Sequence, residues 1–306
     1  MVKYLSGIFA LIKEVKSEKY QIIHVQTFKN AKVEMRLYKH KRRQSKLIHT
    51  VHNLLPHEAK DGDKELYGGF YDICDALIVH NEECKRQLMG LFCVREDKIY
   101  VIPHGAYSII PPQNSEKKEN KTHFLMFGII RQYKGLDILL RAISLIPKSE
   151  RQKMEFIVAG KQYLNQNPID YNEMAQELGI TDCVQLILRR IDDAELPTLF
   201  GWADVCLFPY REIYGSGALL MAYSYNKPVI VSNLPVFIEE TGDGKTGLVF
   251  QNNDVDSLAN CIISYSHLAP HEKEGMSDEI QHLVESKYNW SMSAKLTDNI
   301  YRRLTQ

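Results

Sequence analysis

The stretch YREIYGSGALLMAYSYNKPVI, residues 210–230, joins two short apolar runs in the second half of a 306-residue chain. VCLFP precedes it and PVIVS closes it, and we expect a helix between them that opens at Gly215, Ser216 and Gly217. A strand, a small-residue turn, a helix and a strand form one βαβ unit of a parallel sheet. The small residues fit close packing, and they equally fit an anion held by the free N–H groups of the helix start.

The same alternation of short apolar runs and amphipathic stretches continues along the whole chain. Most of the runs are nearly continuous in Val, Ile, Leu and Phe, which is typical of strands covered on both faces. We expect strands at YQIIHV, KLIHTV, DALIV and KIYVI in the first third, and at HFLMFG, MEFIVAG, VQLIL, ADVCLF, PVIVS and GLVF later. The predicted fold class is therefore α/β, with two Rossmann-like domains built on parallel sheets.

One segment interrupts this rhythm. Residues 108–122, SIIPPQNSEKKENKT, combine two prolines with a charged run and are predicted to be a linker. It would separate an N-terminal domain, 1–107, from a C-terminal domain, 123–285, and the family resemblance described below implies that the first faces the acceptor and the second binds a nucleotide-sugar. The amphipathic tail, 286–306, is predicted to be a helix that packs back towards the N-terminal domain.

The composition excludes several classes of protein. Lys plus Arg and Asp plus Glu number 38 each, so no bulk charge attracts nucleic acid, and we predict no nucleic-acid partner. The six cysteines form no C-x-x-C pair and are expected to be buried, reduced thiols in a cytoplasmic protein, with no metal site. No apolar run approaches the roughly 18 residues of a membrane span.

Two cations follow the first strand expected in the second domain. In HFLMFGIIRQYKGLDILLRAI the strand ends at Gly128, and the loop carries Arg131 and Lys134. Open α/β sheets bind ligands at the carboxyl ends of their strands, where Arg can fork onto two phosphate oxygens and Lys adds a compact charge. A solvated loop with two ordinary surface charges is the alternative. Together with the helix start at Ser216, the loop favours a diphosphate site.

These motifs, in this order, resemble glycosyltransferase family 4, the retaining nucleotide-sugar enzymes of the GT-B fold. Gly128, Arg131, Lys134 and Gly135 match the family's G-x-x-R-x-x-K-G segment, in which the Arg and the Lys hold the donor diphosphate. NKPVIVS and EETGDGKTGLVF match its later segments, and TVHNLLPHE and VIPHGAY its first domain. The resemblance runs from about Gln21 to the C-terminus. It implies two Rossmann-like domains facing a cleft.

The resemblance also assigns residues to the donor, with one departure. The family's E-x7-E motif places its second glutamate, which binds the donor ribose, at Met221, and its first at Ile213, beside Glu212. A thioether accepts hydrogen bonds poorly, so the ribose contact is in question. The loop that lies against the nucleobase corresponds to Arg190 and Ile191. The full set of expected donor-binding residues is Gly128, Arg131, Lys134, Arg190, Ile191, Glu212, Gly215, Ser216, Gly217 and Ala218.

In the first domain, His52 ends the strand KLIHTV, and the family has a histidine here near the sugar and the acceptor. An imidazole can hydrogen-bond a sugar hydroxyl near neutral pH, although a buried structural histidine is the alternative. His57 and His104 are weaker candidates. The resemblance names His52, Arg131 and Lys134 as catalytic, with no cofactor and no metal.

The start of the chain differs from the family pattern. A helix leads directly into YQIIHV, and about four strands are expected against six or so, so the N-terminal domain is predicted to be truncated. Residues 20–25 would then form an apolar sheet edge that self-associates or recruits a partner chain. The basic segment Lys29–Lys46 is either a solvated helix or a peripheral contact with the inner face of a membrane.

The function predicted from the sequence is transfer of a sugar from a nucleotide diphosphate-sugar to a saccharide or lipid-linked acceptor, in cell-surface polysaccharide assembly. The alternative is a non-catalytic nucleotide-sugar-binding protein, or one subunit of a split glycosyltransferase. Met221 and the short first domain favour that alternative.

Overall fold

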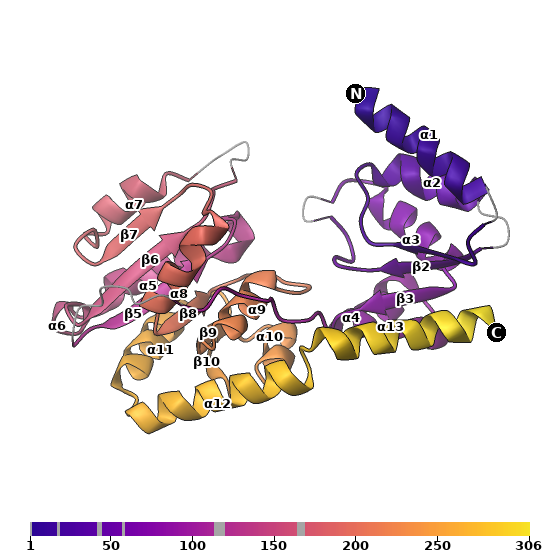
Figure 1. The fold of residues 1–306 in the computed structure, drawn as a ribbon. Helices are drawn as coiled ribbons and strands as arrows, with labels where there is room; N and C mark the ends of the chain where they lie inside the picture. The colour runs from indigo at the N-terminus through magenta and orange to yellow at the C-terminus, as the bar shows by residue number, and fades with distance from the viewer. Residues whose placement is uncertain (1, 17–18, 42–44, 57–58, 113–119, 164–168) are drawn as a thin grey trace. The chain divides into compact units, whose positions relative to one another are not determined.

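A computed structural model of the chain describes residues 2–16, 19–41, 45–56, 59–112, 120–163 and 169–306 (Figure 1). The chain divides into two compact units. The first unit comprises residues 1–104 and 290–306, and the second comprises residues 105–289. His57 and most of the expected linker, residues 113–119, lie outside the described residues.

The first unit is built on a four-stranded parallel sheet with the order β1-β2-β3-β4. Its strands are β1 Ile22–Val25, β2 Lys46–Thr50, β3 Ala76–Val79 and β4 Ile99–Val101. Its helices are α1 Val2–Lys16, α2 Ala31–Lys41, α3 Asp63–Ile73, α4 Glu82–Phe92, the short η1 Glu96–Lys98 and α13 Trp290–Thr305. All four expected strands of this part are confirmed, and their parallel order puts their carboxyl ends at one edge of the sheet.

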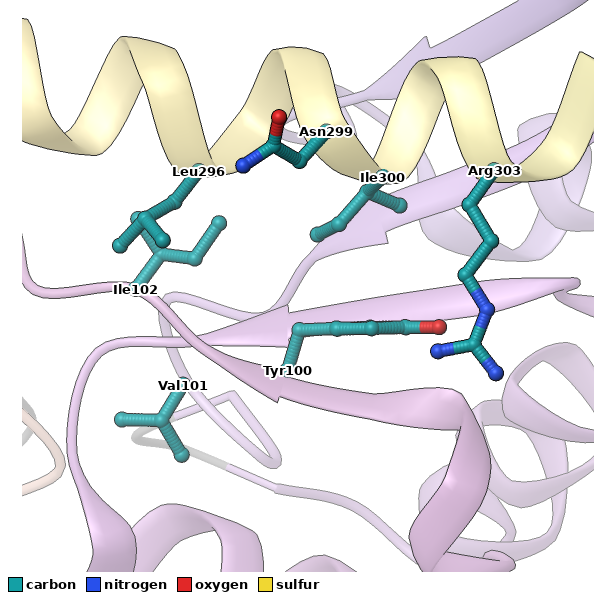
Figure 2. Close-up of a pocket in the computed structure, with 7 residues that line it drawn as sticks. All are labelled: Tyr100, Val101, Ile102, Leu296, Asn299, Ile300 and Arg303. Atoms are coloured by element: carbon teal, nitrogen blue, oxygen red, sulfur yellow. The ribbon is translucent and has the colours of Figure 1, made fainter.

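Helix α13 covers one part of this sheet. Its side chains Leu296, Ile300 and Leu304 lie against a buried cluster that includes Ile48 and Ile102, which explains the apolar stripe of the tail. Figure 2 shows Leu296 and Ile300 pointing from the helix towards the strand below. A cavity of about 240 Å³ remains beside them, lined by Tyr100, Val101, Ile102, Leu296, Asn299, Ile300 and Arg303.

Most apolar residues of the basic helix α2 lie in the core of the first unit. Met35, Leu37 and Tyr38 are buried in the core of the unit, and among the apolar residues interleaved in this segment Val33 is exposed. Three of the four apolar residues interleaved in the basic segment therefore pack inside the unit and not on its surface. The apolar positions of the helix are its core face. Residues 42–44 of the basic segment lie outside the described part of the chain.

The second unit is built on a six-stranded parallel sheet with the order β10-β9-β8-β5-β6-β7. Its strands are β5 Thr122–Phe127, β6 Met154–Ala159, β7 Val184–Ile187, β8 Val205–Phe208, β9 Val229–Ser232 and β10 Gly247–Phe250. All six apolar runs of this half form strands, as predicted. Strands β5 and β8 lie side by side at the centre, although 77 residues separate the end of one from the start of the other.

The second unit also contains eight helices and two short helical turns among its described residues. They are α5 Leu136–Leu145, α6 Lys148–Arg151, α7 Tyr171–Glu177, α8 Leu196–Trp202, α9 Gly217–Ser224, α10 Pro235–Glu240, α11 Val255–His267 and α12 Pro270–Ser286, with the short turns η2 Gln132–Lys134 and η3 Asp193–Glu195. Helices α5 and α11 pack on one buried cluster, and α8 and α9 on another. Helix α12 ends at Ser286 and α13 begins at Trp290, so the tail predicted as one helix from residue 286 begins four residues later.

Two further expectations concern exposed features. Strand β1 is an edge strand of the first sheet, as expected, and Ile22, Ile23 and His24 are half-buried. Cys93 is exposed, so the prediction that the cysteines are buried is wrong for this residue. Among the described residues no helix is long and apolar enough to cross a membrane.

Candidate functional site

The two loops singled out by the sequence meet at the carboxyl edge of the second sheet. One follows β5 and carries Arg131 and Lys134, and the other follows β8 and leads into α9. The loops touch through their backbones, because a Cβ added at Gly135 would lie 1.9 Å from the carbonyl oxygen of Pro209. Gly135 also has φ +70°, a conformation that side chains rarely adopt. A glycine is therefore required where the loops cross.

The amine of Lys134 lies where Gly128 and α9 come together. A Cβ at Gly128 would be 3.2 Å from Lys134 Nζ and 3.5 Å from the Cβ of Ala218, and φ at Gly128 is +116°. The end of β5, the lysine and the first turn of α9 thus surround one small volume. A helix start supplies N–H groups without acceptors and the positive end of the helix dipole. The arrangement is suited to a phosphate group.

The charge of Lys134 is preserved in this environment. Burial acts to lower the pKa of its amine, but the adjacent phenols of Tyr210 and Tyr133 raise it, and the net pKa lies above the ordinary value. The Nζ atom lies 5.0 Å from the centroid of the Tyr210 ring, within reach of a cation–π attraction. Lys134 is therefore a half-buried cation at neutral pH.

Arg131 precedes the short turn that ends at Lys134. Its guanidinium carbon is 4.1 Å from the centroid of the exposed Tyr163 ring, so the two groups stack. Stacking leaves the edge N–H groups of a guanidinium able to donate to phosphate oxygens. Tyr163 was not predicted as a site residue, and its exposed ring beyond β6 was the signal that could have indicated it.

A salt bridge that the sequence did not reveal joins the two loops. Arg211, just after β8, donates to both carboxylate oxygens of Asp137 in the first turn of α5, at 2.9 and 2.7 Å. Its guanidinium also donates to the carbonyl of Gln132 at 2.8 Å, and its backbone N–H to the carbonyl of Tyr133 at 2.7 Å. These four bonds hold the Arg131–Lys134 loop against the loop that starts α9. Only the fold brings the two residues together, since they are 74 positions apart.

The start of α9 is ordered by its own cap. Ser216 Oγ accepts a hydrogen bond from the N–H of Leu219 at 3.1 Å. A Cβ at Gly217 would meet the Tyr107 hydroxyl at 2.8 Å, whereas one at Gly215 would meet nothing within 4 Å. Gly217 therefore makes room for a phenol, and Gly215 leaves open space in front of the helix. Met221, on the second turn of α9, packs against a buried apolar cluster.

Three further predicted donor residues are Arg190, Ile191 and Glu212. Arg190 is exposed in the loop after the edge strand β7, and Ile191 packs against an apolar cluster. Glu212 is exposed. Among the described residues no hydrogen bond or ion pair joins Arg190 or Glu212 to Lys134. The structure thus brings Gly128, Lys134 and Ala218 together, with Gly217 at the start of the same helix.

The carboxyl edge of the first sheet carries histidines instead of cations. His52, after β2, lies 3.1 Å from His80, after β3, measured from Nδ1 to Nε2, and His80 Nδ1 lies 2.9 Å from the carbonyl oxygen of Ile102. The other nitrogen of His52 lies 3.3 Å from the side-chain oxygen of Gln26. The ring of His104 lies 5.5 Å from that of His80 and 4.8 Å from that of Trp290.

The chain of contacts from His52 through Gln26 continues to helix α13. The side-chain nitrogen of Gln26 lies 3.1 Å from His24 Nε2, which also contacts Thr50 Oγ1 at 2.8 Å, and His24 Nδ1 lies 2.6 Å from the Tyr301 hydroxyl. Burial lowers the pKa of His24 and of His80 to about 4, and it lowers that of His52. These rings are neutral at physiological pH. No group of three or more His, Cys, Asp or Glu in the described part of the chain is arranged to hold a metal ion.

The sequence of the second unit matches the profile described as Glycosyl transferases group 1 over residues 110–282, and residues 2–106 match the profile of Glycosyltransferase Family 4. The first match covers more than half of the chain. The chain therefore belongs to the group 1 glycosyl transferases, and the expected family is confirmed.

Individual relatives agree with this family. The chain is 24% identical over 282 residues to D-inositol 3-phosphate glycosyltransferase of Corynebacterium aurimucosum, covering 83% of this chain and 65% of that protein. The chain thus spans less than two thirds of the length of this relative.

Two solved structures share the fold. Sucrose-phosphate synthase from Thermosynechococcus elongatus has a TM-score of 0.79 at 19% identity, covering 99% of this chain and 78% of that one. Anabaena HepE, solved in complex with UDP-glucose, has a TM-score of 0.76 at 15% identity, covering 96% and 82%. The GT-B fold class expected from the sequence is confirmed.

Proposed function

We propose that this protein transfers a sugar from a nucleoside diphosphate-sugar to a saccharide or lipid-linked acceptor, as part of cell-surface polysaccharide assembly. The observation that carries the proposal is the meeting of Lys134, Gly128 and the first turn of α9 at one edge of the second sheet. A charged amine, a bare backbone and a helix start are three independent features that favour a phosphate at the same place. Family membership and the UDP-glucose bound by HepE support the same ligand class.

In the proposed reaction, the bond between the anomeric carbon and the diphosphate breaks, and a bond from that carbon to an acceptor oxygen forms. The diphosphate leaves with the bonding electrons, and its oxygen takes the proton that the acceptor hydroxyl loses. Arg131 and Lys134 stabilise the developing negative charge, together with the backbone of Ser216 and Gly217. His52 contacts a hydroxyl of the sugar or the acceptor. We propose that the anomeric configuration is retained and that transfer requires no metal ion.

Donor binding and donor hydrolysis test this proposal. UDP-, GDP- and ADP-sugars are screened by thermal shift, because a ligand that binds only the folded state raises the melting temperature. A shift with one donor, followed by slow release of its free nucleoside diphosphate, is the expected result. Binding without any hydrolysis or transfer would favour the non-catalytic or split-enzyme alternative. No shift with any donor would contradict the proposal.

We further propose peripheral contact with an anionic membrane surface at the cytoplasmic face. Phe9 of α1 is 71% exposed, and α2, which packs on α1, exposes Lys32, Arg36 and Lys39. An exposed aromatic ring beside cations is suited to the headgroup region of anionic lipids. Co-sedimentation with vesicles containing phosphatidylserine should fall when the three cations become glutamate. Charge reversal at Lys148, Lys153 and Lys245 of the second unit is the control, and an equal loss there would contradict a specific surface.

Self-association through the β1 edge is the remaining proposal about partners. The edge strand presents unpaired backbone groups along one side. Ile22 packs against the buried cluster under α13, so a lysine there would also bury a charge. Gln21 is exposed and directly precedes the strand, so Gln21→Lys is the better test. We expect a concentration-dependent dimer in light scattering that this substitution weakens, whereas a strict monomer would contradict the proposal.

A further inference from the structure

The ring array of the first unit determines where its protons lie. Its members are Tyr301, His24, Gln26, His52, His80 and the carbonyl of Ile102, joined by successive contacts of 2.6 to 3.3 Å. They come from α13, from the ends of the four strands and from the loops just after them. The inference below concerns the chemistry that this array imposes on His52, and its functional meaning rests on the proposed role of that residue.

The carbonyl oxygen of Ile102 starts the assignment, because a carbonyl can only accept a hydrogen bond. His80 Nδ1, 2.9 Å away, must therefore carry a proton. A neutral imidazole has one N–H, so Nε2 of His80 holds a lone pair. His52 Nδ1 lies 3.1 Å from that lone pair and must be the donor. The second nitrogen of His52, Nε2, is then left as an acceptor.

The remaining contacts can be assigned donors and acceptors in the same direction. An acceptor at His52 Nε2 requires the NH₂ group of the Gln26 amide to face it, which turns the amide oxygen towards His24 Nε2. His24 Nε2 then carries the proton, and Nδ1 accepts from the Tyr301 hydroxyl at 2.6 Å. Burial raises the pKa of the Tyr301 phenol, so its hydroxyl remains a donor. Every contact in the array then has one donor and one acceptor, and Thr50 Oγ1, 2.8 Å from His24 Nε2, accepts from the same N–H.

The opposite amide orientation, in which the Gln26 oxygen lies 3.3 Å from His52 Nε2 as described above, is less favourable than the flipped one. With the amide oxygen facing His52 Nε2, that nitrogen must carry a proton, and either His52 or His80 becomes a doubly protonated cation. Burial lowers the pKa of both rings, that of His80 to about 4, so the neutral forms are favoured over a cation at neutral pH. Turning the exposed side chain of Gln26 requires no buried charge. The neutral order therefore prevails.

We propose that His80 is a positioning residue that holds His52 in the Nδ1–H tautomer, so that His52 Nε2 acts as a hydrogen-bond acceptor. Its contact with Gln26 is the longest in the array, at 3.3 Å, and Gln26 is exposed. A hydroxyl of a sugar or acceptor can therefore replace the amide and donate to Nε2. A histidine fixed this way accepts a proton from a hydroxyl and does not donate one to it.

Two substitutions of His80 distinguish the roles of its two ring nitrogens. In His80→Gln the side-chain oxygen can occupy the place of Nε2 and still accept from His52. In His80→Asn the shorter amide can replace the Nδ1 donor to Ile102, but it does not reach His52. Two-bond proton–nitrogen correlation spectra of the full chain, with labelled histidine, report the tautomer of His52 directly. We expect Nδ1–H in the wild type and in His80→Gln, and a mixture of tautomers in His80→Asn.

An Nε2–H tautomer of His52 in the wild type, or an Nδ1–H tautomer that persists in His80→Asn, would overturn the proposal, and neither result depends on catalysis. Transfer activity is the second measurement. We expect kcat/KM to fall about tenfold in His80→Asn and less than twofold in His80→Gln, as for loss of one hydrogen bond. If the tautomer changes as expected while His52→Ala keeps full activity, the positioning stands and the proposed role of His52 fails.

Discussion

The two sheets present different chemistry at equivalent edges. After β5 and β8 the second unit places two cations and bare glycine backbone, held together by the Arg211–Asp137 salt bridge. After β2 and β3 the first unit places two neutral imidazoles, His52 and His80, that hydrogen-bond each other. Both edges are carboxyl ends of parallel strands, so topology alone makes them binding edges. The comparison shows that charge at one edge suits a diphosphate, whereas neutral rings at the other suit hydroxyl groups.

Substitution of Arg131 and Lys134 should have the largest effect on ligand affinity, because it removes the positive charge that distinguishes the edge of the second sheet from that of the first. Charge-assisted hydrogen bonds to phosphate contribute about 1.5–3 kcal/mol each. Arg131→Ala and Lys134→Ala should therefore each weaken binding of the nucleoside diphosphate at least tenfold in calorimetric titration, and the double variant more. Lys245→Ala is the matched control, because this exposed lysine precedes β10 at the opposite edge of the sheet. Unchanged affinity in both single variants would remove the diphosphate assignment.

The pH dependence of stability should also have opposite signs in the two units. Burial lowers the pKa of His49 to about 4, so the unfolded first unit binds more protons, and stability falls as pH drops from 6.5 to 4. Burial raises the pKa of Glu240 in the second unit to about 8, so the folded unit binds the extra proton, and stability falls as pH rises from 4.5 to 8. Each group changes the free energy of unfolding by about 1.4 kcal/mol per pH unit between its unfolded and folded pKa values.

Each unit contains one tryptophan, Trp290 in the first and Trp202 in the second, so single-tryptophan variants can follow urea unfolding of each unit. Glu240→Gln should remove most of the pH slope of the second unit, and it should raise stability at pH 8 by roughly 4 kcal/mol. Its Oε2 atom is buried without a hydrogen-bond partner in the described structure, so a neutral amide loses little. A slope unchanged by this substitution would contradict the assignment to Glu240.

The Arg211–Asp137 salt bridge provides a smaller effect on the same edge. Arg211→Ala and Asp137→Ala should each reduce donor affinity by up to tenfold, because the Arg131–Lys134 loop loses its attachment. The two losses should not add in the double variant, since both remove one interaction. Arg151→Ala, which removes an arginine hydrogen-bonded to the carbonyl of Gly179, is the control. Additive losses would show that the two residues act separately.

Gly217 offers the smallest and most local test. Gly217→Val should reduce donor affinity, because its bulk must displace the Tyr107 hydroxyl in front of the helix start. Gly217→Ala meets only that hydroxyl, the end of a flexible side chain, so a reduction of a few-fold is expected. Tyr107→Phe should restore the alanine variant by removing the contacting oxygen. Loss of folding in Gly217→Val with normal binding in Gly217→Ala would indicate that this glycine serves packing.

Much of the fold follows from local pattern. Ten apolar runs form ten parallel strands, and the loop with Arg131 and Lys134 lies at a strand end, because strand length and composition are local properties. The orientation of the apolar residues of α2 was not predicted, because it depends on what packs beneath the helix. Met35, Leu37 and Tyr38 face the core, and their presence among basic residues did not show this.

The sequence by itself determined which residues end the strands, and therefore which side chains lie at the binding edges. The tertiary structure decided which of them meet. Gly128 and Ala218, Arg211 and Asp137, and His52 and His80 come from separate strands or helices, and their contacts depend on the order of the strands in the sheet. Side-chain pairs so distant in sequence are selected by the packing of whole elements, and no local pattern encodes that packing.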